Sequence, residues 1–171
     1  MLFPRYHNFG LYAILFPTML ELPHAVLGAA IATKIPNPWL ALPLAFLSHF
    51  PLDLIPHWNP SLYTETKQYG RPTRKSTFLV AIDVFLSLGA GALIASRALP
   101  NLAQASLIIL ACFAAVALDV IEGFYFFLGV RTQWLENLIN FQRSFQKRLP
   151  LKPGLLIQGL IILISFLVIY S

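Results

Sequence analysis

The chain has 171 residues, of which 57% are hydrophobic and only 11% are charged. Because a soluble domain usually carries about 25% charged residues, this composition excludes an ordinary soluble protein and favours an integral membrane protein. A net charge of +5 would suggest a nucleic-acid partner in a soluble protein. Here the basic residues lie between apolar segments, where membrane topology explains them, so we expect no nucleic-acid partner. The single cysteine, Cys112, excludes an intrachain disulfide and a CxxC zinc site.

The first apolar segment is interrupted by Pro17 and Pro23. A helix is predicted to start near Leu22, because proline is well accommodated in a first helical turn. Residues 1–20 would then form an N-terminal arm, either mobile or at the membrane interface. Met19 could also be the biological start, which would make the preceding residues an artefact of the assigned start.

Four further apolar segments are each near the ~20 residues that a bilayer requires, and they cover residues 38–55, 76–99, 102–130 and 154–170. With the first helix, they predict an all-α, polytopic membrane helix bundle of about five transmembrane helices in one domain, residues 21–171. The segment 131–152 has apolar residues at helical spacing among polar ones, which predicts an amphipathic helix. That helix would lie on the membrane surface or pack against the ends of the bundle.

The distribution of basic residues predicts the orientation in the membrane. The segments 59–75 and 131–152 hold four and five lysines and arginines, whereas the other two connections hold only Lys34 and Arg97. Because positive charge accumulates on the cytoplasmic side, we expect the two long loops and the N-terminus in the cytoplasm and the C-terminus outside. The expected location is a cell membrane, the inner membrane in a bacterium.

The acidic residues and histidines of the apolar segments all fall near the predicted cytoplasmic ends of their helices. An ionisable group within a bilayer costs roughly 2.5–3.5 kcal/mol on insertion scales, and such groups usually serve a function. Their convergence on one half of the bilayer therefore predicts a shared polar site. The residues are Glu21, His24, His49, Asp53, His57, Asp83, Asp119 and Glu122.

The spacing of these residues points to a metal ion. His49, Asp53 and His57 stand at i, i+4 and i+8, within a stripe of about 80° on a regular helix, although Pro56 is expected to end or bend the helix before His57. Imidazole and carboxylate ligands suit zinc, with manganese or iron as alternatives. The predicted ligand set is His24, His49, Asp53, His57, Asp83 and Asp119.

Two short elements, Glu-Leu-Pro-His at residues 21–24 before a small-residue helix and Ser-His-x-x-x-Asp at 48–53, resemble the membrane-bound metal-dependent hydrolases of bacteria. The resemblance covers residues 21–58, about a fifth of the chain. It implies a metal-dependent hydrolase of the membrane.

The resemblance also implies that His24, His49 and Asp53 are metal ligands. The Pro-Asp-x-Asp-His and Thr-His-Ser-type elements of that family do not occur in this chain. His57 would have to take their place, together with Asp83 and Asp119.

As an enzyme, the protein would use the metal to activate a water molecule that attacks an ester or phosphoester of a lipid-like substrate in the cytoplasmic leaflet. Glu122 or Glu21 could serve as general base. Arg71, Arg74 and Lys75 could hold a phosphate headgroup.

Two other functions remain open from the sequence. A non-catalytic structural or partner-binding membrane protein would pack through small-residue faces such as 28–30 and 89–91, but this leaves Asp83 and Asp119 unexplained. A small metal or proton transporter would use the same ionisable groups. Because five helices contain no inverted repeat, alternating access would require a homodimer.

Overall fold

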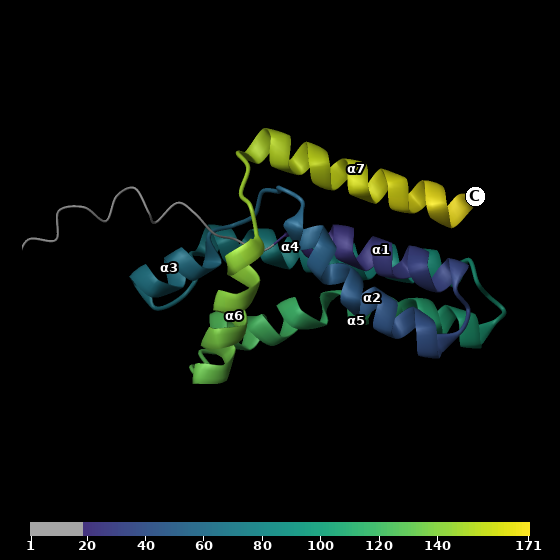
Figure 1. Ribbon diagram of the computed structural model, residues 1–171, viewed down its shortest axis with the longest axis horizontal. Coiled ribbons are helices and arrows are strands. Elements are labelled where there is room, and N and C mark those ends of the chain that lie inside the picture. The colour runs from purple at the N-terminus through teal and green to yellow at the C-terminus, as the bar shows by residue number, and fades with distance from the viewer. Residues whose placement is uncertain (1–18) are drawn as a thin grey trace, which may run out of the picture.

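The computed structural model describes residues 19–171, and every regular element in this part of the chain is a helix. The elements are α1 (Glu21–Lys34), α2 (Pro38–Leu54), α3 (Leu62–Tyr69), α4 (Arg74–Ser96), α5 (Leu102–Phe127), α6 (Gln133–Phe145) and α7 (Leu151–Tyr170). The long helices run along one axis, and α6 crosses that axis near one end (Figure 1). The predicted arm lies outside the described residues except for Met19 and Leu20, as does the question of the start.

Three helices, α4, α5 and α7, are long and apolar enough to cross a membrane. This is fewer than the five spans predicted from the sequence. The α1 and α2 helices have 14 and 17 residues, which corresponds to about 21 and 26 Å at 1.5 Å per residue. Both are shorter than the ~30 Å hydrocarbon core of a bilayer. The prolines explain the short α2: it begins at Pro38 and ends two residues before Pro56, as the sequence predicted.

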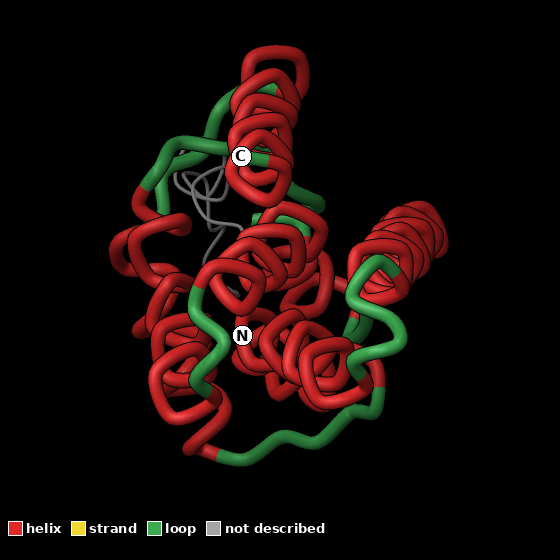
Figure 2. The backbone as a smooth tube through the Cα atoms, turned by 90° about the vertical axis from the view of Figure 1, so that its right-hand side faces the viewer, coloured by secondary structure: helices red, strands yellow, loops and turns green. Residues whose placement is uncertain are grey.

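The α1 helix lies at the centre of the bundle and contacts α2, α4, α5 and α7, as the view along the bundle shows (Figure 2). Its close packing depends on small residues. A Cβ atom on Gly28 would lie 2.5 Å from the carbonyl oxygen of Ala111 on α5, so these two backbones touch directly. Fully buried alanines surround this contact, namely Ala29, Ala41, Ala45 and Ala115.

The polar loop predicted at residues 59–75 contains the short helix α3. The Glu65 carboxylate of α3 accepts hydrogen bonds from the Thr73 amide (2.8 Å) and the Ser76 hydroxyl (2.7 Å). These bonds fix α3 to the start of α4. Lys67 forms an ion pair with Glu136 of α6, at 3.0 Å. At eight residues this helix is shorter than the window over which hydrophobic periodicity is informative, so periodicity did not predict it.

The α6 helix is the amphipathic helix predicted within residues 131–152. It packs against α5 and α2 and buries Leu135, Ile139 and Gln142, which agrees with the predicted alternative of a helix on the ends of the bundle. Trp134 and Phe141 remain exposed on it. One polar side chain, Gln142, therefore continues the buried apolar stripe and points into the bundle.

Candidate metal centre

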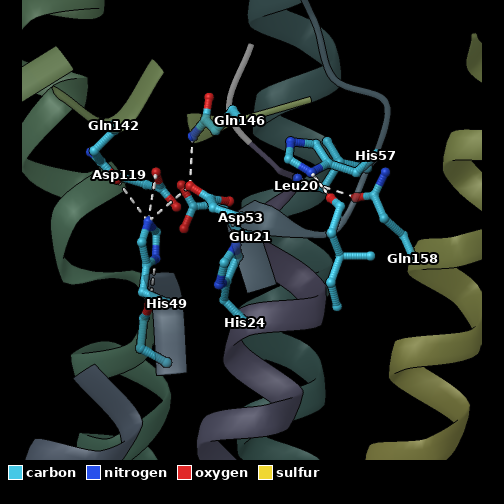
Figure 3. Close-up of polar contacts among 12 residues, drawn as sticks. Leu20, Glu21, His24, His49, Asp53, His57, Asp119, Gln142, Gln146 and Gln158 are labelled. Atoms are coloured by element: carbon cyan, nitrogen blue, oxygen red, sulfur yellow. Dashed lines mark hydrogen bonds and ion pairs between the residues drawn. The ribbon is translucent and has the colours of Figure 1, made fainter. Parts of the chain in front are cut away.

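Three predicted ligands, His24, His49 and Asp53, meet at one end of the bundle (Figure 3). His24 stands on the first turn of α1, and the other two stand one turn apart at the end of α2. All three side chains are fully buried. One ligand atom from each lies within 4.8 Å of the others, so together they could hold a metal ion.

The Asp53 carboxylate faces both imidazoles. Its Oδ1 lies 3.4 Å from His24 Nε2 and its Oδ2 lies 3.4 Å from His49 Nε2. The imidazole rings are stacked, with centroids 4.3 Å apart and planes 22° apart. Hydrogen bonds from N–H to oxygen are usually about 2.7–3.2 Å long, whereas tetrahedral zinc with bonds of about 2.0–2.2 Å separates its ligand atoms by about 3.3–3.5 Å. The two distances from Asp53 to the imidazoles therefore match those between co-ligands of a zinc ion.

The tautomer of His49 follows from its partners. Its Nδ1 lies 2.9 Å from the Ala115 carbonyl oxygen, which can only accept, so Nδ1 carries a proton. In the neutral ring, Nε2 then presents a lone pair to three oxygens: Gln142 Oε1 at 2.9 Å, Asp53 Oδ2 at 3.4 Å and Asp119 Oδ1 at 3.8 Å. Only a proton or a cation at Nε2 makes this arrangement favourable. An Nδ1–H bonded to a backbone carbonyl is also the usual outer-shell contact of a metal-ligating histidine.

Two glutamines from the α6 region support the cluster, and sequence reasoning did not identify them. Gln142 Nε2 donates to Glu122 Oε1 at 2.5 Å while its Oε1 faces His49. Gln146, directly after α6, donates from Nε2 to Asp53 Oδ2 at 2.5 Å. The available signal was that Gln142 continues the buried stripe of Leu135 and Ile139 at helical spacing.

Asp119 and Glu122 of α5 lie beside the cluster, as their i, i+3 spacing allows. Neither oxygen of Asp119 accepts a hydrogen bond from any described residue, and its side chain is only 9% exposed. Both residues line a cavity of about 40 Å³ that also borders Glu21 and Asp83. The cavity brings these four carboxylates together next to His49.

Asp83, another predicted ligand, is not one of the three residues of this cluster. Its carboxylate accepts the backbone amides of Glu21 (2.6 Å) and Leu22 (3.2 Å), and so caps the start of α1 from α4. The residue before α1, Leu20, supplies no side-chain cap. Asp83 thus satisfies amide groups that would otherwise lack partners at the helix start, and it fixes the turn that carries His24.

His57 lies outside the three-residue cluster. Its Nδ1 lies 2.7 Å from the Ile55 carbonyl oxygen, and its backbone pairs with the chain after α6 through bonds to Lys147 and Leu149. Because α2 ends at Leu54, His57 does not continue the helical stripe of His49 and Asp53. Figure 3 draws it on the side of Gln158.

The predicted phosphate-binding residues are exposed, Arg74 and Lys75 at the start of α4 and Arg71 in the loop before it. Arg71 and Arg74 line an open groove of about 560 Å³ together with Tyr69 and Phe78, and no member of the His24 cluster lines it. Lys75 is exposed next to it. These basic residues therefore lie in a different region from the His24–His49–Asp53 cluster.

The donor set fits a divalent cation. Two neutral imidazole nitrogens and one carboxylate are a ligand combination used by zinc, and also by iron and manganese. Outer-shell bonds from Ala115 and Gln146 orient His49 and Asp53. Asp119, at 3.8 Å from His49, is close enough to join them or to bind a water beside them.

No family model, curated protein or solved structure matches this chain.

Proposed function

We propose that this membrane protein is a metal-dependent hydrolase that cleaves an ester or phosphoester in a lipid-like substrate. The observation that carries the proposal is the position of His49 Nε2, which faces three oxygens while Nδ1 is committed to a backbone carbonyl. A proton or a metal ion at Nε2 would satisfy these oxygens, and the ligand atoms of His24 and Asp53 within 4.8 Å support the assignment of a metal ion. Three protein ligands leave a position for water, as in catalytic zinc sites.

A divalent cation held there would act as a Lewis acid toward a water molecule and the scissile group. Glu122 is the proposed proton acceptor, in keeping with the sequence prediction, because it borders both the cavity and the Gln142 bridge to His49. Gln142 and Gln146 hold His49 and Asp53 in place. Glu21 lies further round the same cavity.

We further propose that α1 and α2 lie within the bilayer with the three spanning helices, giving the five-helix arrangement. The α1 helix is enclosed by its neighbours, and α2 exposes large apolar side chains such as Trp39 and Leu47 along its outer face. The end that carries His24 would face the cytoplasm, as the basic residues of the two long loops suggest. Exposed aromatic residues on α6 suit contact with the membrane surface.

The experiment is a hydrolysis assay on the full chain in detergent, using a chromogenic phosphodiester and a chromogenic carboxylic ester, with zinc or manganese added. We expect turnover that a chelator abolishes and the metal restores. His49→Ala should lower it by more than the 10–100-fold that changes to outer-shell residues typically cost. Gly89→Ala, at a position with open space around it, is the matched control and should retain full activity. Equal rates for the metal-loaded parent and His49→Ala would refute the proposal.

A further inference from the structure

The cavity beside His49 is lined by four carboxylates: Glu21 from α1, Asp83 from α4, and Asp119 and Glu122 from α5. No lysine or arginine is among the described residues that line it; the other lining residues are Asn59, Gly123 and apolar side chains. The nearby Arg143 of α6 is outside this lining; its guanidinium lies over the Tyr63 ring, at 3.6 Å, and interacts electrostatically with Glu122. The cavity therefore gathers acidic groups without a basic side chain on its wall.

Asp119 gives a second reason to expect a cation in the cavity, because its one ion-pair partner, His49, lies beyond hydrogen-bond distance. Its side chain is more than nine-tenths buried, and neither carboxylate oxygen accepts a hydrogen bond from a described residue. A buried polar group without a partner costs about 1–3 kcal/mol, and more when it is charged. Asp119 stands between the two regions, with Oδ1 at 3.8 Å from His49 Nε2 and its side chain on the cavity wall.

The cavity has room for a small cation and its water. A volume of about 40 Å³ exceeds the ~10–15 Å³ that a single water needs. The donors on its wall are carboxylate oxygens, with no imidazole among the described residues. Oxygen-only donor sets favour magnesium or manganese, whereas the neighbouring histidines favour zinc or a similar metal.

We infer that this acidic cavity is a second cation site, which takes Mg²⁺ or Mn²⁺ through Asp119 and Glu21 beside the His24–His49–Asp53 centre. Asp119 lies between the two ions, and Asp83 positions Glu21 by accepting its backbone amide. Figure 3 draws Glu21 and Asp119 among the residues around Asp53. The inference goes beyond the proposed hydrolase, because it concerns a second ion and does not require turnover.

The test is a titration of Mn²⁺ into the full chain, which is in detergent and already loaded with zinc. The readout is the electron paramagnetic resonance signal of the Mn²⁺ that stays free. We expect one Mn²⁺ bound per chain. Glu21→Gln and Asp119→Asn should each weaken Mn²⁺ binding by more than about 10-fold. The zinc content should be retained in Glu21→Gln, whose residue is outside the His24–His49–Asp53 cluster. Two variants are used, with monodisperse elution as the folding criterion, because either one could disturb the start of α1 or the centre of α5.

His49→Ala separates this inference from the proposed function. If His49→Ala loses zinc but still binds Mn²⁺, both sites exist and are separable. If the parent binds no zinc yet binds Mn²⁺ in a manner dependent on Glu21 and Asp119, the second site stands and the hydrolase proposal fails. Absence of Mn²⁺ binding to the parent, or Mn²⁺ binding that neither carboxylate variant weakens, would overturn the inference.

Discussion

The two halves of the helix bundle are built differently. In the half away from α6, Gly28 meets the backbone of α5 directly, and the surrounding alanines are fully buried. In the other half, imidazole and carboxylate atoms are equally buried but lack hydrogen-bond partners among the described residues, as at His24 Nδ1 and both oxygens of Asp119. The comparison shows that tight backbone packing supplies stability in one half, while the other half holds polar atoms in a fixed arrangement at a cost of about 1–3 kcal/mol per unpaired group.

The largest expected effect is on metal content, and it compares two buried histidines. His24 and His57 are both fully buried, and each has a ring nitrogen without a partner among the described residues, but only His24 faces the Asp53 carboxylate. His24→Ala should lose stoichiometric metal because it removes one of three ligands, whereas His57→Ala should keep it. Metal per chain is measured by elemental analysis on the monodisperse fraction. Equal metal content in the two variants would contradict the assignment of His24, and not His57, as a ligand.

The next effect concerns two buried glutamines. Gln142 contacts His49 and Glu122, whereas Gln158 contacts the Leu20 amide and the Trp58 carbonyl away from the cluster. Gln142→Leu should weaken zinc affinity about 10–100-fold, the usual cost of losing an outer-shell partner. Gln158→Leu should leave the affinity unchanged, even if it lowers the thermal midpoint. Competition with a chromogenic chelator provides the two affinities, and a larger loss in Gln158→Leu would contradict the assignment.

The packed half of the bundle is probed by a glycine pair. Gly28→Ala forces a methyl group against the Ala111 carbonyl, whereas Gly89→Ala places one in open space. Overpacking of this kind usually costs about 1–3 kcal/mol, so Gly28→Ala should lower the free energy of unfolding in mixed micelles by this amount. Gly89→Ala should be neutral or slightly stabilising. If both substitutions are neutral, the contact between α1 and α5 is looser than described.

The smallest effect is at the surface, where α3 meets α6. Hydrogen bonds from Lys67 and from the Tyr125 hydroxyl lower the pKa of Glu136 below its usual value. A lowered carboxyl pKa stabilises the fold above the usual carboxyl pKa of about 4.3, and this contribution is lost as the pH falls through the folded-state value. The thermal midpoint of Glu136→Gln should thus lie slightly below that of the parent at pH 7 and equal it at low pH. If the difference in thermal midpoint between the parent and Glu136→Gln is the same at every pH, the ion pair is not its cause.

Much of the fold was predictable because long apolar segments of the sequence identify membrane helices. The apolar runs of α4, α5 and α7 located these helices, and the one-sided placement of His24, His49 and Asp119 indicated a shared site. The predicted count of five spans exceeded the three helices that meet the length and hydropathy of a span, because α1 and α2, with 14 and 17 residues, are too short.

The rest of the site depended on contacts that the positions of the ionisable residues do not show. Gln142 and Gln146 are uncharged, so the free-energy cost of burying an ionisable group did not draw attention to them. A glutamine on an amphipathic helix is also ordinarily assigned to the water-facing side. Asp83 was predicted as a ligand because it is an acid within a span. Its contacts with two backbone amides could not be predicted, because such amides are present at every helix start. His57 had the right spacing, but the end of α2 removed it from the helical stripe.

X-ray absorption at the zinc edge, on the full chain loaded with zinc and passed through gel filtration, tests the central claim most directly. The account predicts a tightly bound zinc with nitrogen and oxygen ligands at about 2.0–2.2 Å and multiple scattering from two imidazoles. In His24→Ala the imidazole contribution of any residual zinc should fall to one. A parent protein that retains no zinc after gel filtration, or zinc without imidazole scattering, would contradict the account.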